Sequence, residues 1–197
     1  MRTLKLFFST RPFMSLLFLA LAVRLLAFAV HMPDLERPLI KDSYVYHTMA
    51  IGLIAGEGIR DEGQLSAVAQ PLYPLFLASV YSISDNSRTA VIIIQMLLSA
   101  LTVLIIAAMT RELAGERSSV AAGVIASLYW PLAMAATHIL TETLFIFLLA
   151  GAAYSFMLFQ RRGRLSLAIL SGFLLGLSCL TRAVTLYMAF LAAVLIL

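Results

Sequence analysis

The chain alternates between long apolar runs and short polar connections. The clearest run extends from Ala90 to Met109 and contains no charged residue. A helix needs about 20 apolar residues to cross the hydrocarbon core of a bilayer, because each residue advances its axis by about 1.5 Å. By this criterion the pattern predicts about six transmembrane helices. They cover Phe13 to Val30, Ala90 to Met109, Val120 to Ala136, Thr143 to Phe159, Leu165 to Leu180, and Ala183 to Leu197, and Pro131 breaks the third of them.

The stretch from about residue 32 to residue 88 separates the first two spans, and we take it as the first external loop. Val45, Met49 and Leu53 share one helix face within it, and polar residues lie elsewhere around that helix. This pattern favours a short amphipathic helix lying on the membrane surface.

A second short helix is predicted near the end of this loop. Pro71 precedes the apolar segment from Leu72 to Ile83, and proline is favoured where a helix begins. Ser87 stands just before the next span, where its hydroxyl can accept a hydrogen bond from the first turn. The expected fold is therefore an all-α membrane protein with about six transmembrane helices and short amphipathic helices in the first external loop.

The composition supports a membrane environment for most of the chain. Hydrophobic residues make up 62% of the sequence and charged residues 12%. Soluble domains are typically about 45–50% apolar and about 25% charged. Too few charges remain to cover a water-exposed surface, so we expect residues 1–197 to form a single transmembrane domain.

Lysine and arginine in the short connections indicate the orientation, because they are retained on the cytoplasmic side. With the N-terminus inside, the inner segments contain eight of them, namely Arg2, Lys5, Arg11, Arg111, Arg117, Arg161, Arg162 and Arg164. With a net charge of only +4 and this dispersed placement, they are topology signals and no nucleic-acid partner is expected. We expect a multi-pass protein of the plasma (inner) membrane with both termini inside.

In this orientation, ionisable residues from separate segments meet at the external face. They are Asp42 in the loop, His138 and Glu142 before the fourth span, and Arg182 after the fifth. Ionisable groups at membrane depth are costly and are commonly functional.

Asp42 has two interpretations. It can be the N-cap of the loop helix, with its carboxylate accepting a backbone N–H. It can instead be a general base that activates an acceptor hydroxyl.

Glu142 and His138 share a helix face at a spacing of four residues. The glutamate can be an acidic side chain that extends to the membrane interface, or a carboxylate that acts with Asp42 on the acceptor or the donor. A third interpretation is a divalent metal held by Asp42, Glu142 and His138.

Two arginines lie at or inside spans. Arg24 is within the first span, and Arg182 can reach the interface from the end of the fifth. Each can pair with an acidic side chain or bind a phosphate with its guanidinium group. The pair Gly172 and Gly176 predicts a face for close helix packing.

The order of these motifs resembles the N-terminal half of the GT-C glycosyltransferases, close to the protein mannosyltransferase and aminoarabinose transferase group. Five stretches carry the likeness, namely Leu21–Leu26, Asp42–Ala50, Gln70–Phe76, Leu140–Phe145 and, more weakly, Gly172–Arg182.

The resemblance implies transfer of a sugar from a polyprenyl-phosphate donor to an acceptor at the external membrane face. Asp42 then matches the loop aspartate that acts as base, and Glu142 matches a second acidic position near the site. The expected partners are the lipid-linked sugar, membrane lipid and an acceptor that the sequence does not identify. No cofactor is implied, with a divalent metal kept as the alternative.

The same resemblance makes Arg24 and Arg182 candidates for binding the donor phosphate. Tyr46, His47 and His138 are candidate contacts to the sugar or the acceptor. An aromatic belt at the membrane interface accounts for Tyr46 equally well.

The chain also departs from the family pattern. Many relatives have Asp-Glu where this chain has Asp42-Ser43, and some have an acidic residue where it has Ala69-Gln70. The family has more spans, so we expect an N-terminal portion that stops inside an apolar run at Leu197. The alternative is a truncated or non-catalytic membrane subunit that binds lipid or a partner. A small transporter is less favoured, because the polar groups gather at one face and not at the bilayer midplane.

Overall fold

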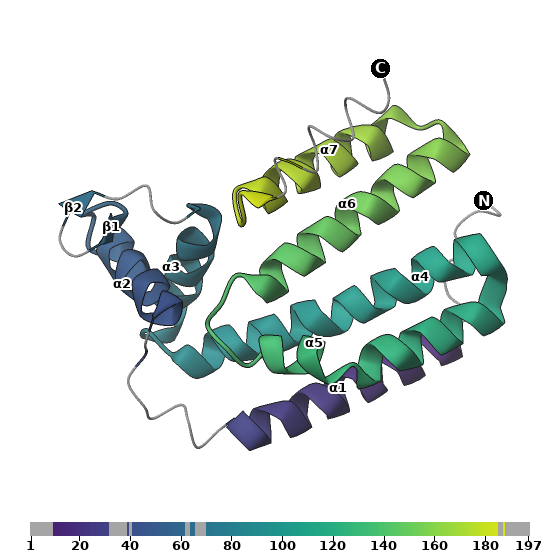
Figure 1. Cartoon of the computed structure of the whole chain (residues 1–197), viewed down its shortest axis with the longest axis horizontal. Helices are drawn as coiled ribbons and strands as arrows, with labels where there is room; N and C mark the ends of the chain where they lie inside the picture. The colour runs from purple at the N-terminus through teal and green to yellow at the C-terminus, as the bar shows by residue number, and fades with distance from the viewer. Residues whose placement is uncertain are drawn as a thin grey trace.

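The computed structural model describes residues 10–31, 39, 41–61, 64–65, 70–184 and 187. Its regular structure is almost entirely helical (Figure 1). The helices are α1 (Thr10–His31), α2 (Asp42–Ile54), α3 (Leu72–Ser84), α4 (Arg88–Leu128), α5 (Trp130–Ala135), α6 (Glu142–Arg162) and α7 (Leu165–Cys179). Two short antiparallel strands, β1 (Arg60–Asp61) and β2 (Gln64–Leu65), lie in the loop between α2 and α3. An all-α membrane protein is thus confirmed.

Among the described residues, three helices are long and apolar enough to cross a membrane, namely α1 from Pro12, α4 and α6. Helix α7 is apolar but has only 15 residues. The predicted sixth span, from Ala183 to Leu197, lies outside the described residues except at positions 183, 184 and 187.

Helix α4 contains the second predicted span and about half of the third. A straight helix of its 41 residues would extend about 60 Å, roughly twice the hydrocarbon thickness. Gly115 interrupts it with φ 82° and ψ −176°, a conformation that is essentially restricted to glycine. The chain folds back there into two limbs (Figure 1), and the Ser119 hydroxyl donates to the Ala107 carbonyl across them at 2.7 Å.

The third predicted span ends earlier than expected. Helix α4 stops at Leu128, Tyr129 is extended, and the short helix α5 follows. Pro131 lies in the first turn of α5, where its missing N–H is tolerated, whereas within a longer helix it would break a hydrogen bond. The predicted span from Val120 to Ala136, which Pro131 was expected to break, is thus divided between α4 and α5.

Small residues let α1 approach α4 closely. Ala20, Ala100 and Ala107 are fully buried in this contact. A Cβ at Gly123 would lie 2.5 Å from Leu16 Cδ1, so a larger residue there would displace the Leu16 side chain. Such close backbone approach is typical of helix packing in membranes.

Helix α7 packs on α6 through a face other than the predicted one. The Ser171 hydroxyl donates to the Ala152 carbonyl at 2.9 Å, and Leu174 lies against Gly151. A Cβ at Gly172 or Gly176 would meet nothing within 4 Å among the described residues. The predicted packing role of this glycine pair is therefore wrong for the described part of the chain.

The two loop helices are confirmed at nearly their predicted positions. Helix α3 begins directly after Pro71, and the Ser87 hydroxyl accepts from the Ala90 N–H at 3.2 Å to cap α4. Helix α2 packs against α3 and buries Met49 and Ala50. Its apolar residues are therefore partly used in a protein contact.

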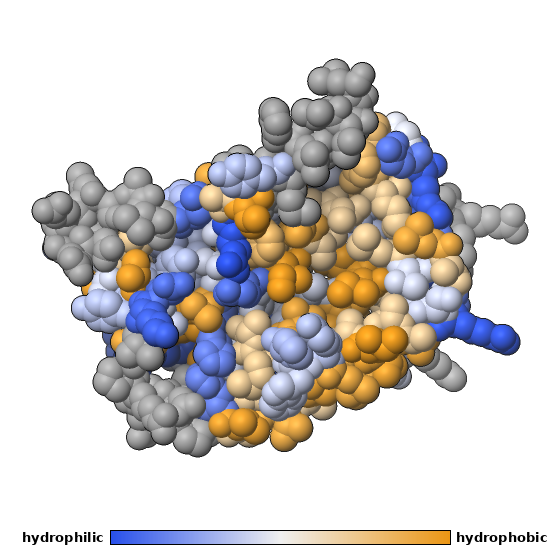
Figure 2. Space-filling view, in the orientation of Figure 1, coloured by the Kyte–Doolittle hydropathy of each residue, from blue (hydrophilic) through white to orange (hydrophobic). Residues whose placement is uncertain are grey.

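Polar residues gather at opposite ends of the helix bundle, with an apolar band between them (Figure 2). One end holds the fold-back of α4 and the α6–α7 turn, where Glu112 pairs with Arg161 at 3.4 Å and with Arg162 at 3.3 Å. The other end holds α2, α3 and the start of α6 (Figure 1). The predicted inner connections therefore share one end, and the predicted site residues lie toward the other.

Candidate functional site

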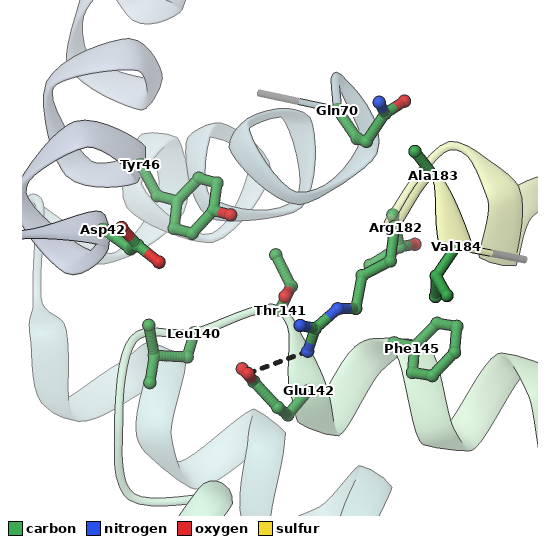
Figure 3. A pocket seen from close by; sticks show the side chains of 11 residues that line it. Asp42, Tyr46, Gln70, Leu140, Thr141, Glu142, Phe145, Arg182, Ala183 and Val184 are labelled. Carbon is green, nitrogen blue, oxygen red and sulfur yellow. Dashed lines mark hydrogen bonds and ion pairs between the residues drawn. The ribbon is translucent and has the colours of Figure 1, made fainter. Parts of the chain in front are cut away.

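A cavity of about 470 Å³ lies where α2, the start of α6 and the segment after α7 meet (Figure 3). It combines charged, polar and apolar groups. Its lining residues are Asp42, Tyr46, Gln70, Leu140, Thr141, Glu142, Phe145, Thr181, Arg182, Ala183 and Val184. A cavity of this size is in the range of small-molecule binding sites, about 300–1,000 Å³.

Two helix starts supply the acidic groups of the cavity. Asp42 is the first residue of α2, and Glu142 is the first residue of α6. The unpaired N–H groups and the positive end of the helix dipole favour carboxylates at these positions. Asp42 and Glu142 are 100 positions apart in the sequence, and they face the cavity from separate walls (Figure 3).

The interpretation of Asp42 as an N-cap is wrong. Lys41 occupies the cap position, with φ 53°, and provides no side-chain cap hydrogen bond. Asp42 is already in the helix, and its side chain is exposed to the cavity. Its carboxylate is therefore available for a role other than capping.

Arg182 is held in place by the turn that ends α7. Its backbone N–H donates to the Ser178 carbonyl at 3.0 Å. In the same turn the Leu180 carbonyl accepts from the Leu72 N–H at 3.0 Å. This bond joins the end of α7 to the start of α3 and brings Arg182 to the cavity.

Arg182 forms an ion pair with Glu142. The Nη1–Oε1 distance is 2.8 Å, and the guanidinium carbon lies 5.8 Å from the centre of the Phe145 ring. The two charged side chains are 41% and 37% exposed, so the pair adds only about 0–1 kcal/mol to stability. A ligand with a stronger negative charge can compete for Arg182 at low cost.

Tyr46 places its hydroxyl in the cavity (Figure 3). Its ring packs edge-on against Tyr73 at a centroid distance of 5.1 Å. Burial raises the pKa of the Tyr46 phenol, and the nearby carboxylates of Asp42 and Glu142 raise it further. The hydroxyl therefore stays protonated at neutral pH and can donate a hydrogen bond to a ligand.

The two candidate histidines do not line the cavity. His47 Nδ1 lies 3.0 Å from the Tyr81 hydroxyl, and burial followed by the charge of Arg88 lowers the pKa of His47. His138 Nδ1 lies 2.9 Å from the Met134 carbonyl, and its ring packs at a tilt against the His31 ring, with a centroid distance of 4.3 Å. Both imidazoles are used in contacts between segments of the protein.

Arg24 also lies away from the cavity. Its side chain is fully buried between α1 and both limbs of α4. Nε donates to the Ser99 hydroxyl at 3.1 Å, and Nη1 donates to the Ser127 carbonyl at 2.9 Å and to the Ala20 carbonyl at 3.3 Å. These bonds connect α1 to the folded-back α4, so the structure does not bring Arg24 and Arg182 together.

The cavity provides few ligands for a metal. Among the described residues, no group of three His, Cys, Asp or Glu side chains could hold a metal ion. The set of Asp42, Glu142 and His138 is not assembled, because His138 turns toward Met134 and His31. Arg182 also competes for the Glu142 carboxylate.

Sequence reasoning did not single out three polar residues that line the cavity. Gln70 precedes Pro71, and Thr141 and Thr181 stand next to the two charged residues of the ion pair. For the two threonines the available signal was their position beside those charged residues, because neighbours at a helix end share one local site.

The geometry describes a helical membrane protein with a cavity of two carboxylates and one arginine at one polar end. The chain belongs to the dolichyl-phosphate-mannose-protein mannosyltransferase family, whose sequence profile matches residues 68–197. It is thus a membrane protein of the glycosyltransferase class, and the expected GT-C resemblance is confirmed. The match includes Glu142 and Arg182, whereas Asp42 and Arg24 precede it. No curated protein and no solved structure matched the chain.

Proposed function

We propose that the cavity binds a polyprenyl-phosphate sugar and that the chain supplies groups for transfer of this sugar to an acceptor at the external membrane face. The main support is the convergence of Asp42, Glu142 and Arg182 on one cavity in a chain of this family. The family description names a dolichyl-phosphate-linked mannose, which is therefore the first donor to test. The cavity is at the end of the bundle opposite the basic connections, which supports the external face.

In the proposed reaction, Asp42 accepts the proton of an acceptor hydroxyl or amine. The acceptor atom attacks C1 of the sugar, and the bond between C1 and the phosphate oxygen breaks. The electron pair stays on the departing lipid phosphate, whose charge Arg182 stabilises. Because Glu142 already pairs with Arg182, we assign Glu142 to orienting that guanidinium and the donor.

Tyr46 is the best-placed aromatic contact for the sugar. Its protonated hydroxyl can donate to a sugar hydroxyl, while its ring is fixed by Tyr73. We assign no substrate contact to His47, His138 or Arg24, since other groups of the protein hold them. Arg182 is therefore the phosphate-binding candidate that we retain.

Asp42→Asn tests the base. The chain is reconstituted in liposomes with dolichyl-phosphate mannose. Donor binding is measured together with mannose release, in which water is the acceptor that attacks C1 and gives its proton to Asp42. We expect the rate to fall by about 100-fold or more, because the amide cannot accept the proton, with donor binding retained. Asp85→Asn is the matched control, since Asp85 is an exposed acid outside the cavity and asparagine tolerates its left-handed backbone.

The other outcomes separate the alternatives. Full activity of Asp42→Asn would remove this residue from the mechanism. Loss of both transfer and donor binding would indicate a role in binding the donor or a metal. Donor binding by the wild-type chain without any transfer would support the non-catalytic lipid-binding subunit.

A further inference from the structure

Gln95 is a polar residue in the middle of the apolar first limb of α4. Its side chain is fully buried, yet it neither lines the cavity nor carries a charge. A buried amide in such a setting is costly unless both its donor and its acceptor are paired. The partners of Gln95 therefore show what keeps it in place.

Both ends of this amide are hydrogen-bonded. Oε1 accepts from the Tyr73 hydroxyl at 2.9 Å. Nε2 donates to the His138 carbonyl at 2.7 Å and to the Ala136 carbonyl at 3.3 Å. This orientation of the amide is the consistent one, because the reverse would place its oxygen against two carbonyl oxygens.

The partners support the two walls of the cavity from behind, without lining it. Tyr73 is in α3, and its ring packs against Tyr46, which projects into the cavity from α2. Ala136 and His138 are in the segment that connects α5 to α6, directly before Thr141 and Glu142. One side chain thus links the support of Tyr46 to the support of Glu142.

We propose that Gln95 is a positioning residue that holds the two walls of the cavity in register. It acts through Tyr73 on the side of Asp42 and Tyr46, and through two backbone carbonyls on the side of Glu142. The expected effect of Gln95 on the transfer rate rests on the proposed function. Its expected effect on the spacing of the walls rests on the geometry alone.

Gln95→Leu removes all three hydrogen bonds with a side chain of similar size. We expect kcat to fall by about 10- to 100-fold, because displacements of about 1 Å at reacting groups have effects of this order. KM for the donor should change much less, since Arg182 is held by the end of α7. Tyr73→Phe removes only one of the three bonds and should give a smaller loss of kcat in the same direction.

Thr102→Val is the matched control on the same helix. Thr102 is equally buried, but its hydroxyl donates only to the Leu98 carbonyl one turn earlier. A purely structural role for Gln95 predicts that both variants lower the yield of folded protein and leave kcat per folded molecule unchanged. That result would overturn the proposal.

The wall spacing can be measured without any transfer activity. Spin labels at Ser79→Cys in α3 and Ala135→Cys in α5, in a Cys179→Ala background, report the distance between the walls by electron–electron double resonance. We expect a broader distance distribution in Gln95→Leu and an unchanged one in Thr102→Val. Identical distributions in all proteins would overturn the positioning role, whether or not the wild type transfers sugar. If Gln95→Leu does not fold, Tyr73→Phe provides the same comparison.

Discussion

At the residue scale, one ion pair determines which charged groups of the cavity are available to a ligand. Glu142 and Arg182 neutralise each other, which leaves Asp42 as the remaining formal charge among the lining residues. A phosphate group that takes the guanidinium from Glu142 would gain charge-assisted hydrogen bonds and free that carboxylate. The pair thus keeps Arg182 pre-oriented for a phosphate ligand.

Replacing Arg182 tests whether a phosphate group takes its guanidinium from Glu142. We expect Arg182→Gln to raise the donor KM by about 10- to 100-fold, because hydrogen bonds to charged groups contribute about 1.5–3 kcal/mol. Thermal unfolding should change little, since the pair with Glu142 is more than one-third exposed. The matched control is Arg164→Gln, an exposed arginine at the start of α7. A donor KM equal to that of the wild type would show that Arg182 does not bind the phosphate.

At the element scale, residues that favour helix starts predicted where helices begin, because these preferences depend only on neighbouring residues. Pro71 at the start of α3 and Ser87 as the cap of α4 are such cases. Contacts between distant segments were not predictable in this way. Arg24 reaches a carbonyl 103 residues away at Ser127, and Gln95 pairs with carbonyls more than 40 residues away. The periodicity within one helix does not identify such partners. The sequence therefore did not predict that distant polar groups hold Arg24 away from the cavity, where a phosphate-binding role was expected.

The fold-back of α4 depends on one glycine and gives a prediction at this scale. Gly115→Ala should lower the free energy of unfolding by about 1–3 kcal/mol, because the backbone conformation is strained for any residue with a Cβ. A steric clash does not contribute, since a Cβ there meets nothing within 4 Å among the described residues. Thermal unfolding in detergent measures the effect.

Gly172→Ala is the control for this substitution. Gly172 is exposed within α7, where alanine is the better helix former by about 1 kcal/mol. We expect this variant to be as stable as the wild type or slightly more stable. Equal stability of Gly115→Ala and the wild type would contradict the requirement for glycine at the fold-back.

At the scale of the whole molecule, the apolar band separates two chemically different ends. The end with Arg161 and Arg162 is basic, and the cavity lies at the other end, near the start of α6 (Figure 1). The proposed donor, with its lipid in the bilayer, would present its head group to this cavity. The arrangement therefore suits a lipid-linked substrate that meets a water-exposed acceptor.

The positive-inside rule predicts that the basic end faces the cytoplasm and that the cavity faces outside. Single cysteines are placed in a Cys179→Ala background at Gln160, near the basic end, and at Glu57, in the loop after α2. Both positions are exposed, and neither substitution removes a lysine or arginine that sets the topology. A membrane-impermeant maleimide added to intact cells should label position 57 and leave position 160 unlabelled until the membrane is opened. Labelling of position 160 from outside, with position 57 protected, would reverse the orientation and move the cavity to the cytoplasmic face. The proposed external transfer would then be wrong, even though the fold and the cavity would stand.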